Sequence, residues 1–141
     1  MISTVAVGTD GSATANKAVS EAAELARRFD AKLVLLSAFD DSRKPTTDPD
    51  QDIELQWATN PAARVKSILE ALESELSGSG LECETRADKG DPAEVLVRLA
   101  DECGADLLVI GNRGMKRRVL GSVPNTVTHK AHCSVLVVKT T

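Results

Sequence analysis

Two short segments of this sequence carry the residues best suited to bind a phosphorylated ligand. The first is residues 8–12, in which the Asp10 carboxylate could accept hydrogen bonds from ribose hydroxyls or help to hold a metal ion. The second contains Gly111, Gly114 and Gly121, followed directly by Ser122. Glycines let the backbone approach a ligand closely and leave N–H groups pointing at it. Because the glycines also lead into the start of a helix, the second segment predicts a phosphate-binding loop.

Each segment also has a purely structural interpretation. The glycines could serve as turn residues in a tight connection, with Ser122 acting as the N-cap of the following helix. Asp10 could likewise cap the first helix. The basic run at residues 116–118 is typical of a solvated patch, and its place among the glycines leaves contact with phosphates as the alternative.

The sequence lacks the motifs of several other kinds of phosphate, metal and redox sites. The chain has no GxxxxGK[ST] loop and no GxGxxG after a predicted strand. Cys83, Cys103 and Cys133 form no CxxC and are expected to be free, partly buried thiols. His129 and His132 lie near a helix end, where they complement the helix dipole rather than bind a metal. No pair of nucleophile and base is evident, so we identify no catalytic residue and no metal ligand.

Composition narrows the class of protein. The 141 residues match one domain, residues 1–141, with a formal net charge of −4. This charge and an aromatic content of 2% disfavour nucleic-acid binding, which needs basic surface and stacking platforms. The N-terminus lacks the features of a signal peptide, and no apolar run reaches the roughly 20 residues that span a bilayer. We expect a single-domain cytoplasmic protein that binds neither nucleic acid nor membrane.

The elements that position the two segments alternate between short apolar runs and helical periodicity, which is typical of βαβ units. Apolar runs predict strands at residues 4–8, 32–38, 106–110 and 134–138, and an alternating run predicts a wetter edge strand at 81–86. Helices are predicted beyond Ser12 to about residue 30, from the cap and first position at Asn60-Pro61 and at Asp91-Pro92, and at 122–131. Residues 39–59 are too polar to bury and are predicted to form a surface excursion.

The predicted fold is α/β, a doubly wound five-stranded parallel sheet with four helices. In such sheets, ligands bind beyond the carboxyl ends of the strands, where the strand order reverses. If the first three strands wind outward in one direction and the fourth returns beside the first, the two segments meet in one crevice. The candidate site therefore lies between the first and fourth strands.

The order of motifs along the whole chain resembles the universal stress protein family. The motifs are Thr9-Asp10-Gly11-Ser12, Gly90-Asp91-Pro92, and Gly111-Asn112-Arg113-Gly114 followed by Gly121-Ser122-Val123. The resemblance implies a Rossmann-like fold with strand order 3-2-1-4-5 and, in the nucleotide-binding branch, an ATP site. It also implies a regulator in stress response and signalling with at most slow hydrolysis, rather than a dedicated enzyme.

The resemblance assigns roles to individual residues. Asp10 would hold the ribose, and Ala38 and Ile110 would flank the adenine. The residues that would cradle the phosphates are Gly111, Gly114, Gly121, Ser122 and Val123. Thr9 and Arg113 lie inside the same motifs and are included among the expected binding residues.

The glycine loop departs from the family pattern. That pattern is G-x2-G-x9-G-[ST], whereas residues 115–120 alone separate Gly114 from Gly121 here. The loop is three residues short, so the number of phosphates stays open among ATP, ADP, AMP and cyclic AMP. Mg²⁺ would enter only with the phosphates of the ligand.

A homodimer is expected through the last strand, Val135–Val138. A Val-rich strand at a sheet edge leaves unpaired backbone groups that invite pairing with a second copy. The resemblance implies the same pairing across a two-fold axis. The alternative to the nucleotide-binding function is a dimeric interaction protein of the same fold that binds no nucleotide, and the sequence names no further protein partner.

Overall fold

The computed structural model describes residues 1–40, 60–112 and 121–139. The elements in these ranges are β1 (Thr4–Gly8), α1 (Ala13–Phe29), β2 (Lys32–Phe39), α3 (Pro61–Ser77), β3 (Cys83–Lys89), α4 (Pro92–Glu102), β4 (Leu107–Asn112), α5 (Ser122–Lys130) and β5 (Ser134–Lys139). The surface excursion predicted at residues 39–59 lies outside the described residues, apart from its first two positions. No helix within the described ranges is long and apolar enough to cross a membrane.

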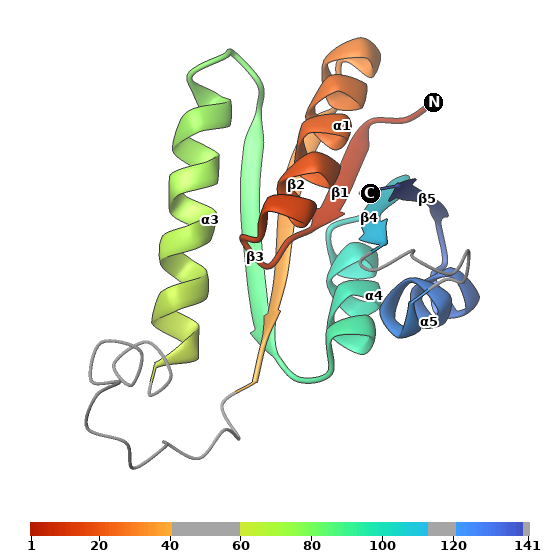
Figure 1. Cartoon of the computed structure of the whole chain (residues 1–141). Helices are drawn as coiled ribbons and strands as arrows, with labels where there is room; N and C mark the ends of the chain where they lie inside the picture. The colour runs from red at the N-terminus through yellow and green to blue at the C-terminus, as the bar shows by residue number, and fades with distance from the viewer. Residues whose placement is uncertain (41–59, 113–120, 140–141) are drawn as a thin grey trace.

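The strands form one parallel sheet in the order β3-β2-β1-β4-β5 (Figure 1). The chain moves outward from β1 to β3 and then crosses back to place β4 on the other side of β1. This topology confirms the predicted doubly wound sheet and its strand order. It also confirms that the third and last strands lie at the two edges. The direction of winding reverses between β1 and β4, where the sequence predicts the site.

Among the described residues, α1 and α3 cover one face of the sheet and α4 and α5 cover the other, and each pair buries its own core. Val5, Val7 and Leu33 pack with α1 and α3, whereas Ala6 and Val34 pack with α4 and α5. Because successive strand side chains point to opposite faces, a strand covered on both faces must be apolar at nearly every position. This requirement explains the continuous apolar runs of β1 and β2.

Backbone pairing, rather than apolar content, sets where the strands end. β3 was expected over residues 81–86 but runs to Lys89, because it stays paired with β2 as far as Phe39. β4 was expected to end at Ile110 but continues to Asn112, which pairs with Lys139 of β5. Both extensions carry polar residues, so periodicity alone could not reveal them.

The helix caps match the sequence at α3 and α4 but not at α5. The Asn60 and Asp91 side chains accept hydrogen bonds at the starts of α3 and α4, as predicted. The expectation that Ser122 caps the last helix is wrong, because α5 begins at Ser122 and its N-cap is Gly121. Gly121 has no capping side chain, and its own N–H donates to Asn112 Oδ1 at 3.0 Å. Asn112 therefore ties the end of β4 to the start of α5.

The three cysteines are free and half-buried, as expected. Burial raises the pKa of each thiol, to about 11 for Cys83. At neutral pH these thiols stay protonated, and a protonated thiol is a poor nucleophile. The cysteines therefore pack as small apolar residues.

Candidate functional site

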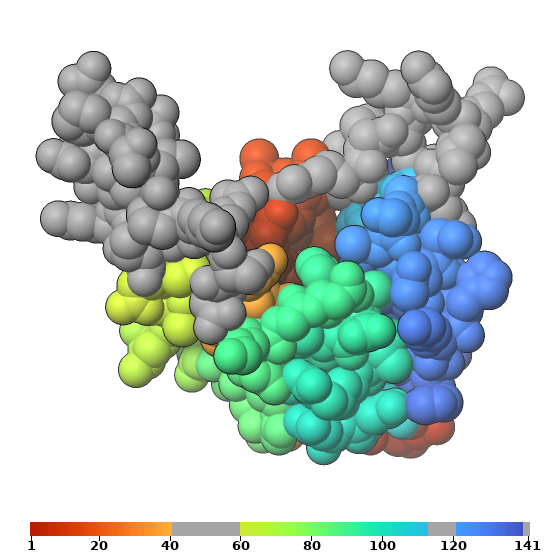
Figure 2. All heavy atoms as spheres, turned by 90° about the horizontal axis from the view of Figure 1, so that it is seen from below, coloured from red at the N-terminus to blue at the C-terminus, as the bar shows by residue number. Residues whose placement is uncertain are grey.

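A pocket of about 530 Å³ opens where β1 and β4 end. This volume is in the range of small-molecule sites, roughly 300–1,000 Å³. Figure 2 looks onto this edge of the sheet, where the red start of α1 lies between the orange end of β2 and the blue α5. The residues that line the pocket are Gly8, Thr9, Asp10, Ser12, Thr14, Ala15, Ala38, Pro92, Leu96, Ile110, Gly111, Gly121, Ser122, Val123 and Pro124.

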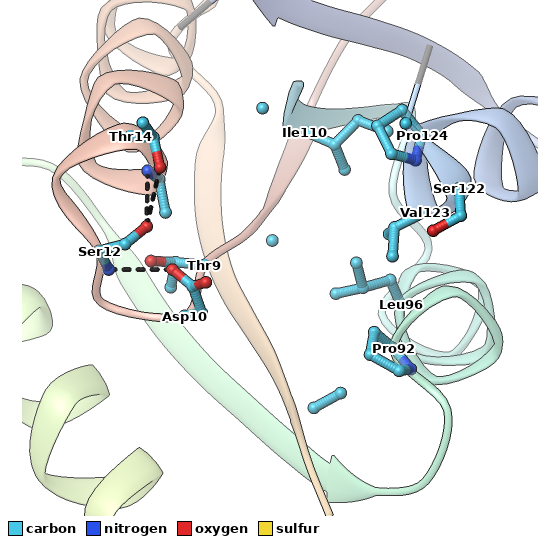
Figure 3. A pocket seen from close by; sticks show the side chains of 15 residues that line it. Thr9, Asp10, Ser12, Thr14, Pro92, Leu96, Ile110, Ser122, Val123 and Pro124 are labelled. Carbon is cyan, nitrogen blue, oxygen red and sulfur yellow. Dashed lines mark hydrogen bonds between the residues drawn. The ribbon is translucent and has the colours of Figure 1, made fainter. Parts of the chain in front are cut away.

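The pocket has a polar side and an apolar side, which Figure 3 shows facing each other. The polar side comes from the turn between β1 and α1 and from the start of α1, and the apolar side comes from α4, β4 and α5. The polar group is Thr9, Asp10, Ser12 and Thr14, and the apolar group is Pro92, Leu96, Ile110, Val123 and Pro124. A ligand with one flat apolar part and one hydroxylated part matches this division.

The turn between β1 and α1 is held by hydrogen bonds within itself and to β2. The Thr9 N–H donates to the Leu36 carbonyl at 2.9 Å, and the Gly11 N–H donates to Thr9 Oγ1 at 3.1 Å. Asp10 Oδ1 accepts from the Ser12 N–H at 2.9 Å. Gly11 has a φ of +81°, a conformation that glycine adopts at little cost. These contacts place the Asp10 carboxylate at the mouth of the pocket.

Ser12, and not Asp10, caps α1. Ser12 Oγ accepts from the Ala15 N–H at 3.1 Å and lies 3.0 Å from Thr14 Oγ1. The alternative interpretation of Asp10 as the cap of the first helix is therefore wrong. Asp10 stabilises the turn that precedes the cap and remains exposed at the pocket.

The opposite side of the pocket is the end of β4 and the first turn of α5. Gly111 and Gly121 line the pocket, and the bond from Gly121 to the fully buried Asn112 fixes their relative position. Neither α1 nor α5 has an acidic residue in its first turn. A helix N-terminus carries about half a positive charge, so both helices favour an anion here.

Most of the predicted site residues meet in this pocket. Those that line it are Thr9, Asp10, Ala38, Ile110, Gly111, Gly121, Ser122 and Val123. Arg113 and Gly114, together with the basic residues at 116–118, lie outside the described residues.

Sequence reasoning missed the contribution of α4. Pro92 and Leu96 lie four residues apart, so they share one face of the helix and both line the pocket. Leu96 also packs over Gly8, where an added Cβ would lie 3.0 Å from Leu96 Cδ1. The Gly90-Asp91-Pro92 motif was a usable signal for this wall, because it places the start of α4 at the same edge of the sheet.

The lining residues favour binding over acid–base chemistry. Asp10 is the one titratable side chain among the described residues that line the pocket. In the ranges the structure covers, no three His, Cys, Asp or Glu side chains are grouped to hold a metal ion. The arrangement can contact hydroxyls, an apolar ring and an anion at the same time.

Comparisons with known proteins agree with this geometry. The model of the universal stress protein family matches residues 1–139. A universal stress protein of Mycobacterium tuberculosis is 39% identical over 145 residues, which cover 98% of this chain and 97% of the relative.

Two solved structures extend the likeness to the fold. A universal stress protein in complex with cAMP is 35% identical, has a TM-score of 0.75 and is matched over 99% of this chain and 98% of its own. A universal stress protein of Archaeoglobus fulgidus in complex with dAMP is 26% identical, has a TM-score of 0.66 and is matched over 97% and 98%. With this sheet order, this pocket and these relatives, the chain belongs to the universal stress protein family.

Proposed function

We propose that the pocket binds an adenine nucleotide and that its occupancy regulates a stress response through protein contacts. The observation that carries this proposal is the pocket itself, which brings together a carboxylate, an apolar wall and a helix N-terminus at the carboxyl ends of β1 and β4. The relatives solved with cAMP and dAMP support the same ligand class. With Asp10 as the one titratable lining residue among those described, any hydrolysis of ATP would be slow.

The two sides of the pocket suggest how the nucleotide lies. The Asp10 carboxylate is suited to accept hydrogen bonds from the ribose. Ala38 and Ile110 are suited to flank the adenine, and Pro92 and Leu96 extend the apolar surface that they offer. This arrangement leaves the phosphates to the start of α5.

The phosphate group of the proposed ligand would meet backbone N–H groups at the start of α5. Gly111, Gly121, Ser122 and Val123 line this part of the pocket. The family resemblance adds Arg113 and Gly114, which lie outside the described residues. Mg²⁺ would come with ATP or ADP, bound to the ligand's own phosphates.

Nucleotide that copurifies with the protein tests the proposal most directly. Acid release followed by mass spectrometry should find an adenine nucleotide at a substantial fraction of the protein concentration. A preparation that carries none, and that shows no heat of binding with AMP, cAMP or ATP in calorimetry, would favour the alternative interaction protein that binds no nucleotide.

The short glycine loop predicts that affinity will not rise steeply from AMP to ADP to ATP. Three fewer residues remove up to about 10 Å of extended reach, and with it N–H groups for a terminal phosphate. Cyclic AMP should therefore compete with ATP. Calorimetry at low and moderate salt, with and without Mg²⁺, gives the affinities.

A triple change of Lys116, Arg117 and Arg118 to Ala is the control for this series. If these side chains replace lost N–H contacts, each should contribute about 1 kcal/mol or less to ATP binding, because solvent screens exposed charges. A hundredfold preference for ATP that survives the triple change would show that the short loop still clamps a triphosphate.

We also propose that the chain forms a homodimer through β5. This strand lies at a sheet edge, and Leu136 within it is 38% exposed. Leu136→Lys should raise the dimer dissociation constant at least about tenfold, since a charge on an edge strand opposes strand pairing. Light scattering over a concentration series measures the change.

Phe29→Lys is a matched control for the dimer. Phe29 is another exposed apolar residue, at 44%, but it ends α1 rather than lying on the edge strand. We expect this variant to dimerise as the unchanged protein does. A protein that is monomeric at tens of micromolar before any substitution would rule out this dimer.

A further inference from the structure

Ser37 is a buried polar residue that does not reach the pocket. It lies in β2 and is 3% exposed. Strand side chains alternate, so Ser37 shares the sheet face of Leu33 and Leu35, which pack with α1 and α3. Its neighbour Ala38 points to the other face and lines the pocket. Ser37 is therefore separated from the proposed ligand by the thickness of the sheet.

The Ser37 hydroxyl nevertheless contacts the turn that carries Asp10. Its Oγ donates to the Thr9 carbonyl at 2.7 Å, and this bond is buried. The Thr9 carbonyl belongs to the peptide group that joins Thr9 to Asp10. On the other side of the same residue, the Thr9 N–H donates to the Leu36 carbonyl at 2.9 Å. Two consecutive residues of β2 thus hold both backbone polar groups of Thr9.

The two bonds hold the two peptide groups that flank the Thr9 Cα, one bond to each group. Only the bond from Ser37 holds the Thr9–Asp10 peptide, from which the Asp10 side chain departs, and together the two bonds restrict rotation about the backbone of Thr9. The shared strand also sets the position of Asp10 relative to Ala38, because Ser37 and Ala38 are adjacent in β2. A nucleotide that contacts both residues needs this distance to be constant.

We propose that Ser37 is a positioning residue for nucleotide binding, which acts through the Thr9–Asp10 peptide from the face of the sheet opposite the pocket. This inference rests on the proposed function, since it assumes that Asp10 contacts the ribose. It assigns the Ser37 hydroxyl to ligand affinity rather than to stability alone.

Ser37→Ala tests the role directly. We expect about tenfold weaker binding of AMP, which corresponds to about 1.4 kcal/mol, because the carboxylate loses its fixed orientation. Ser37→Thr retains the hydroxyl and should recover most of the affinity. Calorimetry gives the affinities, and thermal unfolding shows that each variant is folded at the temperature of the binding measurement.

A ligand without ribose hydroxyls distinguishes an effect of Ser37 on the position of Asp10 from a general disturbance of the binding site. If Ser37 acts through Asp10, Ser37→Ala should bind 2′,3′-dideoxy-AMP as well as the unchanged protein does. In an Asp10→Ala background, adding Ser37→Ala should likewise cost no further AMP affinity. A tenfold loss that persists for the dideoxy ligand or in the Asp10→Ala background would overturn the proposed role.

Ser79→Ala is the matched control. Ser79 Oγ also donates to a backbone carbonyl at 2.7 Å, that of Leu76, but this bond lies at the C-terminal end of α3. Its loss should leave AMP binding unchanged.

The outcomes distinguish this inference from the proposed function. If the unchanged protein binds AMP and Asp10→Ala weakens it while Ser37→Ala does not, the positioning role alone is overturned. If the unchanged protein binds no adenine nucleotide, the proposed function fails, and the role of Ser37 fails with it.

Discussion

Replacing Asp10 by Ala should weaken AMP binding by about 1–3 kcal/mol, or about five- to 150-fold. The reason is that hydrogen bonds to a charged group contribute more than neutral ones, and Asp10 is the one carboxylate among the described lining residues. Calorimetry on folded protein measures the loss. The effect should shrink with 2′,3′-dideoxy-AMP, which offers no ribose hydroxyl to the carboxylate.

Asp10→Asn separates the two tasks of this side chain. Asp10 Oδ1 accepts from the Ser12 N–H, so Asp10→Ala also removes a hydrogen bond within the turn. Asn retains an oxygen acceptor for Ser12 but loses the negative charge. We expect Asn to preserve stability and to show an intermediate affinity. If Ala, Asn and the unchanged protein bind AMP equally well, Asp10 only shapes the turn and the site assignment is wrong.

The strands of the sheet could be predicted because they depend on signals that are local in the sequence. Near-continuous apolar runs at residues 4–8 and 32–38 need cover on both faces, and helical segments between strands supply that cover. The order 3-2-1-4-5 came with the family resemblance. The position of the pocket followed from the strands and their order, because the carboxyl ends of the first and fourth strands meet where the direction of winding reverses.

Local periodicity could not show which partner each residue has. Asn112 was predicted as part of a glycine loop, yet it is a fully buried member of β4 that accepts from the Gly121 N–H. The expected cap at Ser122 was wrong for the same reason, because the cap position had gone to a glycine held by this asparagine. A hydrogen bond between residues nine positions apart, such as that between Asn112 and Gly121, produces no periodic pattern in the sequence.

Residues that act from outside the pocket were the hardest to find. In the sequence, Ser37 is a small residue within an apolar strand, and no neighbouring residue indicates that it contacts Thr9. Its hydroxyl finds its partner only when β1 and β2 pair. That pairing brings Ser37 Oγ within 2.7 Å of the carbonyl of Thr9, a residue 28 positions earlier in the chain. The same holds for Ile68 of α3, which packs against Gly11.

Gly11→Ala should destabilise the protein by about 2–4 kcal/mol and lower AMP affinity at least about tenfold. Gly11 has a φ of +81°, where a residue with a Cβ is strained by about 1–2 kcal/mol. An added Cβ would also lie 3.0 Å from Ile68 Cδ1 and 3.1 Å from its Cγ2. Crowding of this kind typically costs a further 1–3 kcal/mol, and the lower entropy of the unfolded chain without this glycine offsets about 0.4–1 kcal/mol of the sum.

Gly80→Ala is the matched control for the backbone strain. Gly80 has nearly the same φ, +84°, but an added Cβ would meet no atom within 4 Å. It should therefore show the strain of the left-handed conformation without the clash, and a loss of about 1 kcal/mol after the entropic gain of removing a glycine. Because Gly80 lies beyond α3 and away from the pocket, its AMP affinity should not change.

A double-mutant cycle with Ile68→Ala isolates the contact between α3 and the turn. If Ile68 and the new methyl group compete for space, Gly11→Ala should cost less in the Ile68→Ala background than in the unchanged protein. The difference should match the excess of Gly11→Ala over Gly80→Ala, since both quantities measure the same clash. Additive losses would mean that Ile68 moves aside freely, and that the turn at Asp10 is held by its hydrogen bonds to β2 without help from α3. AMP affinity should also be measured on the unchanged protein, the two single variants and the double variant. If Gly11 lets α3 pack against the turn that presents Asp10, the double variant should regain AMP affinity together with stability, relative to Gly11→Ala.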